Sequence, residues 1–345
     1  MSLIVAYFGI LTVLVIALNA RYFGQLLGVM DDPAKENHKT HTLPTPLVGA
    51  LMIGALAMFI ILDQFLFETS TRMMGISVCT ILVGVLGLVD DKIQLSWQSR
   101  LGAIAAISTL LVLWVPELRI DNLMWSFGYT TDLGPVFGGM FTVLCLMTLV
   151  ISFNMMDGFN GGVIGMSFIL FVIMALIATN PHRQAICLFL ASALGIMFIY
   201  NMKGEFFLGD GGAYALGLLV GSTALLTYNV GANIPIYGDT IFLWLTIPTL
   251  DCLRVVISRR LSKANPFYAG RDHLHHILMA QIGPMKTLLV FLATTIVFVG
   301  LSLFAEGLTY ILFLAQVGFF SLAIKMARRA NAQLAESAVL QNEIE

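Results

Sequence analysis

Long apolar stretches recur from one end of the chain to the other, and they constrain the fold more than any other feature. A helix needs about 20 apolar residues to cross the hydrocarbon core of a bilayer. A mean hydropathy of +0.90 and a charged fraction of 11% agree with repeated crossings. We therefore predict an all-α, polytopic integral membrane protein of ten or eleven transmembrane helices. The predicted spans are residues 2–19, 47–67, 73–89, 102–116, 137–153, 161–179, 184–200, 212–228, 240–257, 287–305 and 308–325.

The two ends of the chain differ in composition. The first span lacks a basic segment before it and a small-residue cleavage site, so we expect a retained helix and not a removed signal peptide. A polar, helix-prone segment follows the last span. We predict one transmembrane domain over residues 1–325 and a polar cytoplasmic tail over residues 326–345.

Basic residues are distributed unevenly between the two sides of the predicted membrane. If the first helix runs inward, all but three of the 18 Lys and Arg residues fall on the inside; the exceptions are Arg72, Arg119 and Arg183. Cytoplasmic loops carry an excess of Lys and Arg in membrane proteins. The N-terminus is therefore predicted outside and the C-terminus in the cytoplasm.

Carboxylates stand at two sites on the predicted cytoplasmic side. Asp90 and Asp91 end an apolar run without a spacer, although a charge near hydrocarbon costs roughly 2.5–3.5 kcal/mol. A divalent cation or a cationic partner would offset that cost, and a solvated helix end is the alternative. Asp210 lies between Gly209 and Gly211, where the backbone can approach a ligand closely. Magnesium held jointly with a diphosphate suits it; an ordinary Asp-Gly turn is the alternative.

A third group of polar residues follows the fifth span. Asn154, Asp157 and Asn160 recur every three residues, so on a helical turn they would share one side. They would offer hydrogen-bond donors and acceptors to a hydroxyl-rich or amide-bearing ligand. An ordinary loop between helices has the same composition.

The longest inside loop is rich in basic residues and histidines, which suit phosphate groups. We discount a transition-metal site because no cysteine or glutamate accompanies the histidines. Asp251, in the ninth span, either pairs with Arg254 at helical spacing or borders a lipid phosphate. Lys39, on a proline-stiffened loop, is a candidate phosphate ligand. The basic residues and histidines of the long loop are Arg259, Arg260, Lys263, Arg271, His273, His275 and His276.

Taken together, these segments resemble the polyprenyl-phosphate N-acetylhexosamine-1-phosphate transferase family, in particular its undecaprenyl-phosphate N-acetylglucosaminyl-1-phosphate transferases of glycosyltransferase family 4. The similarity extends from about residue 31 to residue 282 and keeps the order of the family's motifs. The stretches that carry it are Asp32-Pro33, His38-Lys39-Thr40-His41, Pro44-Thr45-Pro46, Leu88-Val89-Asp90-Asp91, Phe153-Asn154-Met155-Met156-Asp157-Gly158, Phe207-Leu208-Gly209-Asp210, Asn265-Pro266-Phe267 and Arg271-Asp272-His273-Leu274-His275-His276.

The resemblance implies transfer of N-acetylhexosamine-1-phosphate, specifically GlcNAc-1-phosphate, from a UDP-N-acetyl sugar to undecaprenyl phosphate, with release of UMP. It implies Mg²⁺ as cofactor, with Mn²⁺ as a substitute, and no nucleic-acid partner. Asp90 and Asp91 would be catalytic, and Asp90 and Asp210 would bind the metal. The implied substrate-binding residues are Lys39, Asn154, Asp157, Asn160, Arg271, His273, His275 and His276.

The resemblance further implies a multi-pass protein of the bacterial inner membrane that initiates cell-surface polysaccharide synthesis, such as lipopolysaccharide O-antigen or cell-wall polymers. The oligomeric state stays open, a homodimer included. Asn160 stands where many family members have aspartate, which removes a charge from that position.

Two other functions remain open at this point. One is the same reaction with another UDP-N-acetyl sugar, since one substituent changes few contacts. The other is a secondary transporter, which many helices and charges at their ends would also fit. Transporters usually show repeated halves with polar residues near mid-membrane. Here no repeat is found, and the carboxylates gather at one face.

Overall fold

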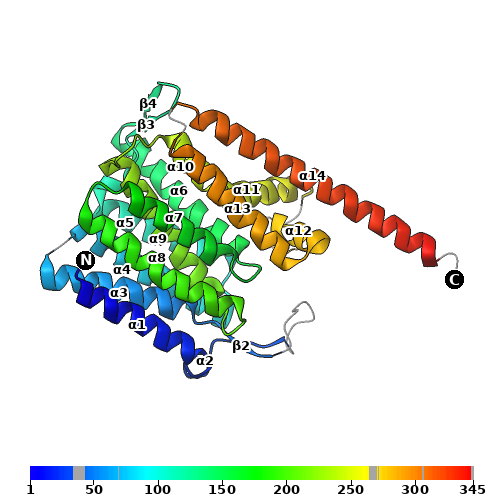
Figure 1. Cartoon of the computed structure of the whole chain (residues 1–345), viewed down its shortest axis with the longest axis horizontal. Helices are drawn as coiled ribbons and strands as arrows, with labels where there is room; N and C mark the ends of the chain where they lie inside the picture. Colours follow the sequence, from blue (N-terminus) through cyan, green and yellow to red (C-terminus); the bar gives the residue numbers. More distant parts are fainter. Residues whose placement is uncertain (34–42, 69, 264–269, 271, 305–306, 343–345) are drawn as a thin grey trace.

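The computed structural model describes residues 1–33, 43–68, 70–263, 270, 272–304 and 307–342, and their side chains as far as Met326. This part of the chain is almost entirely helical (Figure 1), which confirms the all-α prediction. The helices are α1 (Leu3–Leu18), α2 (Ala20–Leu27), α3 (Gly49–Phe67), α4 (Thr71–Ile93), α5 (Trp97–Trp114), α6 (Gly134–Met156), α7 (Gly162–Ile177), α8 (Pro181–Met202), α9 (Gly209–Val230), α10 (Gly238–Trp244), α11 (Thr246–Leu261), α12 (Leu274–Ile282), α13 (Pro284–Ser302) and α14 (Thr309–Asn342), with a 3₁₀ turn over Pro116–Leu118.

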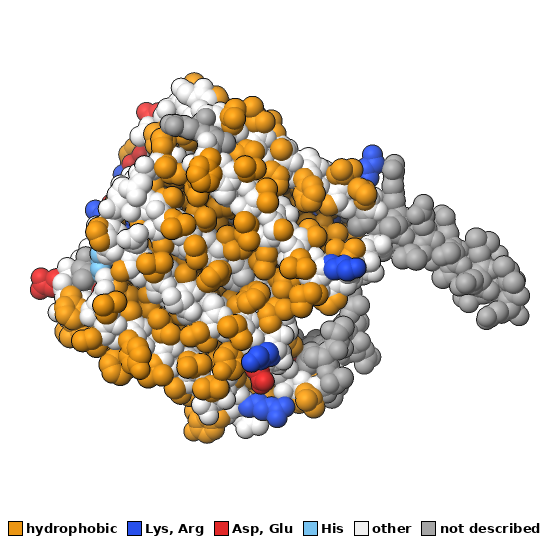
Figure 2. All heavy atoms as spheres, viewed as in Figure 1, with side chains coloured by type: hydrophobic (Ala, Val, Ile, Leu, Met, Phe, Trp, Pro, Cys, Tyr) orange, Lys and Arg blue, Asp and Glu red, His pale blue; other side chains and the backbone are white. Residues whose placement is uncertain are grey.

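Each predicted span coincides with a helix or a bent pair of helices. Within the described residues, seven helices are long and apolar enough to cross a membrane, or nine if each bent pair counts as one span. The prediction of ten or eleven is higher because it included α5 and α7, and α7 has only 16 residues. Hydrophobic side chains cover most of the visible face of the bundle (Figure 2), as lipid contact requires.

Helix α9 forms the centre of the bundle. Every residue from Gly211 to Tyr228 is buried, and the helix packs against α3, α4 and α6. Small residues such as Gly212 and Gly217 let neighbouring backbones approach closely, which is how helices associate in a membrane. Asp210, in the first turn of α9, is therefore held by the most deeply buried helix of the fold.

Sharp bends occur at the end of the first predicted span and within the ninth. Helices α1 and α2 meet at an angle of 80°, where Asn19 leaves the helical conformation. Helices α10 and α11 meet at 79° about Leu245, so the predicted continuous span 240–257 is wrong in this respect. Pro248 lies in the first turn of α11, where a missing N–H costs little.

Two short hairpins stand at opposite ends of the bundle. Strand β1 (Met30–Asp31) pairs with β2 (Thr45–Pro46) near the start of α3. Strand β3 (Asn122–Met124) pairs with β4 (Thr130–Asp132) between α5 and α6. The Phe207 N–H donates to the Pro46 carbonyl at 2.9 Å, which ties the first hairpin to the segment that enters α9.

Helix α14 continues as one element through residue 325, where a tail was predicted to begin, and extends beyond the bundle (Figure 1). The domain boundary at residue 325 stays a prediction.

Candidate active site

Three helix ends meet at one end of the bundle and bring the predicted polar residues together. Helix α4 ends with Asp90 and Asp91, α6 ends beside Asn154 and Asp157, and α9 begins with Asp210. Contacts between α4 and α9 and between α6 and α9 hold this arrangement. Residues more than a hundred positions apart in the chain thus share one site.

Asp91 accepts hydrogen bonds from backbone amides in the first turn of α9. Its Oδ1 accepts a hydrogen bond from the Asp210 N–H at 3.0 Å, and its Oδ2 accepts one from the Gly211 N–H at 3.2 Å. An acidic group at a helix N-terminus satisfies amide donors that lack partners within the helix. Glycines permit the approach, since a Cβ added to Gly87 would lie 2.4 Å from the Gly211 Cα. Gly209 has a φ of +71°, which favours glycine.

Asp210 and Asp157 complete a group of three carboxylates with Asp91. The Asn154 amide donates to Asp210 Oδ1 at 2.6 Å and so orients this carboxylate. Loss of water around Asp157, and then the charges of Asp210 and Asp91, raise the pKa of Asp157 to about 8. Such mutual repulsion is what a bound cation would relieve.

The neighbouring Asp90 points into different surroundings. It is 3% exposed, and its Oδ1 accepts from the Leu95 N–H at 2.8 Å. Its Oδ2 accepts from Arg100 Nη1 at 3.1 Å and from the Tyr214 hydroxyl at 2.9 Å. Asp90 is thus part of an ion pair, in contrast to Asp91.

Residues 272–276, which lead into α12 and are here called the histidine loop, are anchored on α11. Asp251 accepts hydrogen bonds from His273 Nδ1 at 2.9 Å, from the Leu274 N–H at 3.0 Å and from Arg254 Nη2 at 2.7 Å. The sequence had left Asp251 open between a partner for Arg254 and a lipid-phosphate contact; it does pair with Arg254 and also fixes the start of α12.

His275 packs directly on the loop that carries Asp157. Its ring stacks on Phe159 with centroids 5.5 Å apart, and a Cβ added to Gly158 would lie 2.1 Å from its Nε2. His275 is 1% exposed and neither ring nitrogen has a hydrogen-bond partner among the described residues. Burial, followed by the charges of His276 and His273, lowers the pKa of His275 to about 3, so the ring is neutral.

Asn201 links two loops of the site, and the sequence analysis did not identify it. Its Oδ1 accepts from the Gly161 N–H at 2.7 Å, and its Nδ2 donates to the Phe206 carbonyl at 3.0 Å. The loop after α6 and the loop before α9 are therefore connected through one buried amide. A polar residue at the end of an apolar span was the only available signal.

The structure brings some of the predicted site residues together but not all of them. Asp91, Asn154, Asp157 and Asp210 lie together, whereas Lys39 and Arg271 fall outside the described residues. The predicted helical face that would join Asn154, Asp157 and Asn160 is wrong, because α6 ends at Met156 and Asn160 lies in a turn.

The donor set fits a hard divalent cation. Within the described residues, no group of three or more His, Cys, Asp or Glu side chains is placed so that together they could hold a metal ion. Magnesium rarely needs one, since it takes one or two carboxylates and fills its remaining positions with water and phosphate oxygens. Asp210 with Asp91 or Asp157 would supply those carboxylates.

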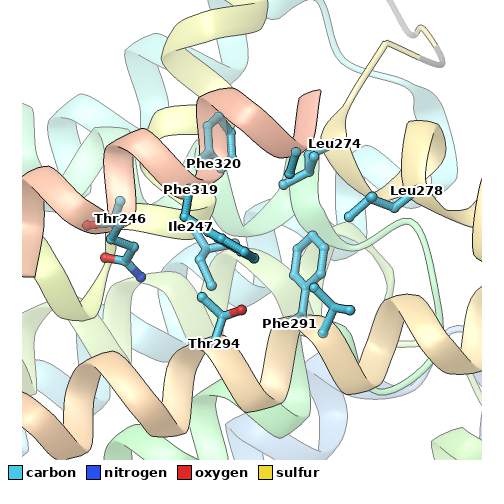
Figure 3. A pocket seen from close by; sticks show the side chains of 11 residues that line it. Thr246, Ile247, Leu274, Leu278, Phe291, Thr294, Phe319 and Phe320 are labelled. Atoms are coloured by element: carbon cyan, nitrogen blue, oxygen red, sulfur yellow. The ribbon is translucent and has the colours of Figure 1, made fainter. Parts of the chain in front are cut away.

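A separate pocket lies between α11, α12, α13 and α14 (Figure 3). Leu274, Phe291 and Phe320 are among its lining residues, and no ionisable side chain borders it. The polar chemistry therefore belongs to the carboxylate cluster and not to this pocket.

Comparison with known proteins agrees with this geometry. The family described as glycosyl transferase family 4 matches residues 73–228, a range that covers α6 and nearly all of α4 and α9. The chain is 26% identical over 271 residues to the undecaprenyl-phosphate alpha-N-acetylglucosaminyl 1-phosphate transferase of Escherichia coli strain K12, covering 75% of this chain and 71% of that protein. It is 28% identical over 279 residues to the probable undecaprenyl-phosphate N-acetylglucosaminyl 1-phosphate transferase of Bacillus subtilis strain 168, covering 79% and 75%.

Proposed function

Because this chain belongs to glycosyl transferase family 4, we propose that it transfers N-acetylglucosamine-1-phosphate from UDP-N-acetylglucosamine to undecaprenyl phosphate. The observation that carries the proposal is the group formed by Asp91, Asp157 and Asp210 where three apolar helices end. Carboxylates gathered at a membrane face suit a reaction between a lipid phosphate and a water-soluble diphosphate.

The chemistry balances without an external acid or base. A phosphate oxygen of undecaprenyl phosphate attacks the phosphorus that bears the sugar and forms a new P–O bond. The bond from that phosphorus to the bridging oxygen breaks, and UMP leaves with this oxygen. A phosphate monoester is already largely ionised near neutral pH, so the nucleophile needs little deprotonation.

The residues of the site would position the two phosphates and balance their charge, which is most of what phosphoryl transfer requires. Asp210, with Asp91 or Asp157, would hold Mg²⁺, which supplies positive charge to the diphosphate when bound. Asn154 orients Asp210. His273, held by Asp251, and His275, packed on Gly158, would lie beside the donor.

The proposed orientation places this site at the cytoplasmic face of the bacterial inner membrane. A nucleotide sugar is polar and charged and does not cross hydrocarbon, so the site must open to the compartment that contains it. The lipid-linked sugar would then initiate a cell-surface polysaccharide such as O-antigen.

Release of UMP tests the proposal. Purified protein in detergent receives undecaprenyl phosphate, Mg²⁺ and UDP-N-acetylglucosamine. We expect UMP only when lipid and metal are both present, with a loss of at least about a hundredfold in Asp91→Asn and in Asp210→Asn. Asp132→Asn is the matched control, because Asp132 is exposed at the opposite end of the bundle.

Other UDP-N-acetyl sugars are assayed in parallel, since one substituent changes the rate by a modest factor. Activity with another sugar alone would correct the donor and keep the reaction class. No UMP from any of them, with protein that unfolds cooperatively, would refute the transferase.

A further inference from the structure

We propose that Asp90 is a positioning residue, fixed by Arg100 and Tyr214, and that Asp91 is the carboxylate of the adjacent pair that faces the reacting groups. The inference rests on the proposed transferase function and gives different roles to two neighbouring aspartates that sequence alone treats alike. Arg100 and Tyr214 enter the site as residues with a role of their own.

The groups around Asp90 already supply its carboxylate with hydrogen-bond donors and a positive charge. Its two oxygens accept hydrogen bonds from the Leu95 backbone at 2.8 Å, Arg100 at 3.1 Å and Tyr214 at 2.9 Å. Two of these donors are side chains from other helices, α5 and α9. A buried carboxylate with a cationic partner and two further donors has its acceptor positions largely filled and has little capacity left to bind a metal.

Asp91, unlike Asp90, has no cationic partner among the described residues. Among the described residues its hydrogen bonds come from the backbone amides of Asp210 and Gly211. Its nearest charged neighbours include the carboxylates of Asp90 and Asp31, and its charge in turn acts on Asp157. Successive helical residues point about 100° apart, so the two side chains leave α4 in different directions and have different hydrogen-bond donors, although the carboxylate of Asp210 lies beside both.

The position of Tyr214 explains what the Asp90 cluster does. Tyr214 lies four residues after Asp210 on α9, so the two side chains are on one face of that helix. A hydrogen bond from Tyr214 to Asp90 therefore fixes the rotation of α9 that presents Asp210. Arg100 fixes the start of α5 to the same carboxylate. The cluster holds three helices in register around Asp91.

A double-mutant cycle separates positioning from catalysis. We measure kcat and KM for wild type, Asp90→Asn, Arg100→Gln and the double variant Asp90→Asn/Arg100→Gln. Each single variant leaves an unpaired group, so we expect kcat to fall about tenfold or more, and the double variant to recover most of that loss. The KM for UDP-N-acetylglucosamine should change less than kcat.

The matched control is the same cycle on the neighbour, with Asp91→Asn and Asp91→Asn/Arg100→Gln. No recovery is expected there, because Asp91 is not paired with Arg100. Tyr214→Phe removes one hydroxyl and should lower kcat without moving its pH profile. A folded double variant at Asp90 and Arg100 that is as inactive as Asp90→Asn, or a pH limb lost only in Asp90→Asn, would overturn the proposal.

The thermal unfolding midpoints of the same four proteins keep this test separate from the proposed function. A positive coupling between Asp90 and Arg100 in stability is expected whether or not wild type releases UMP. An inactive wild type with that coupling would refute the transferase while supporting the pairing; absence of the coupling would refute the pairing itself.

Discussion

The imidazole of His275 is neutral because the fold excludes water from it. Its ring lies between Phe159 and His276, with centroids 5.5 and 4.1 Å away. A protonated ring in this position would lose its hydration without gaining an anionic partner. The same stacking closes the histidine loop onto the loop of Asp157. The neutral state of the His275 ring therefore depends on the packing of these two loops against each other.

We predict that acid removes the contribution that neutral His275 makes to stability. The unfolded ring binds a proton below its ordinary pKa of about 6.5, whereas the folded ring does so only near pH 3. The contribution of His275 to stability is therefore complete above about pH 6.5 and is lost as the pH falls below it, at up to about 1.4 kcal/mol per pH unit. The raised pKa of Asp157 contributes in the opposite sense, so the effect of His275 is read as a difference between variant and wild type. In thermal unfolding between pH 7 and pH 5, His275→Gln should lack this contribution, so its unfolding midpoint should rise relative to that of wild type as the pH falls.

His276→Gln is the comparison for that experiment, because His276 lies next to His275 in α12 and is only half-buried. It should retain most of the pH dependence. Equal slopes in wild type and His275→Gln would show that the buried ring does not control acid stability.

The pair of helices α4 and α9 sets the geometry of the site at the level of elements. Gly84, Gly87 and Gly211 lie at their contact, where a Cβ on Gly211 would be 2.8 Å from the Gly84 carbonyl oxygen. Backbone-to-backbone contact is what allows Asp91 to reach the amides at the start of α9. The activity of the site is therefore expected to depend on the distance between α4 and α9.

We predict that Gly87→Ala lowers both stability and activity. In an isolated helix alanine is favoured over glycine by about 1 kcal/mol, so propensity alone would stabilise the variant. Here the new Cβ would lie 2.4 Å from Gly211 Cα, and the helices must separate. Overpacking of this kind costs about 1–3 kcal/mol, which exceeds the gain.

Gly102→Ala in α5 is the control, because nothing lies within 4 Å of the added Cβ. Thermal unfolding and UMP release are compared for both variants. A Gly87→Ala protein as stable and active as Gly102→Ala would show that α4 and α9 tolerate a wider spacing.

Hydropathy predicted the long helices well because lipid selects for apolar residues along the whole of each span. It could not predict the break at Leu245 or the short helix α12, since both depend on contacts with other elements. The hairpin of β3 and β4 also escaped prediction. Tyr228 fixes it by accepting a bond from the Met124 N–H at 2.7 Å, over 104 residues of sequence.

At the scale of the whole molecule, the sequence indicated which loops converge but not how their side chains pair. Asp90 and Asp91 were given overlapping roles because adjacent carboxylates look alike in a sequence. Their difference comes from Arg100, 10 residues away, and from Tyr214, 124 residues away. Such a distinction follows from the packing of α5 and α9 against α4, which no local pattern encodes.

The orientation of the bundle determines which compartment the carboxylate cluster faces. The excess of Lys and Arg on one side predicts that this end is cytoplasmic. Lys203 is exposed after α8 near the start of α9, whereas Asp132 is exposed at the far end of the bundle. These two positions therefore report on opposite sides of the membrane.

We predict that a membrane-impermeant maleimide labels Asp132→Cys in intact cells and labels Lys203→Cys only after the membrane is opened. The protein's own Cys79, Cys187 and Cys252 are buried and Cys145 is half-buried within α6, so unmodified protein gives the background. The reverse pattern would place Asp91 and Asp210 outside the cell, away from nucleotide sugars. The transferase would then lack access to its donor, and the distribution of basic residues would need another explanation.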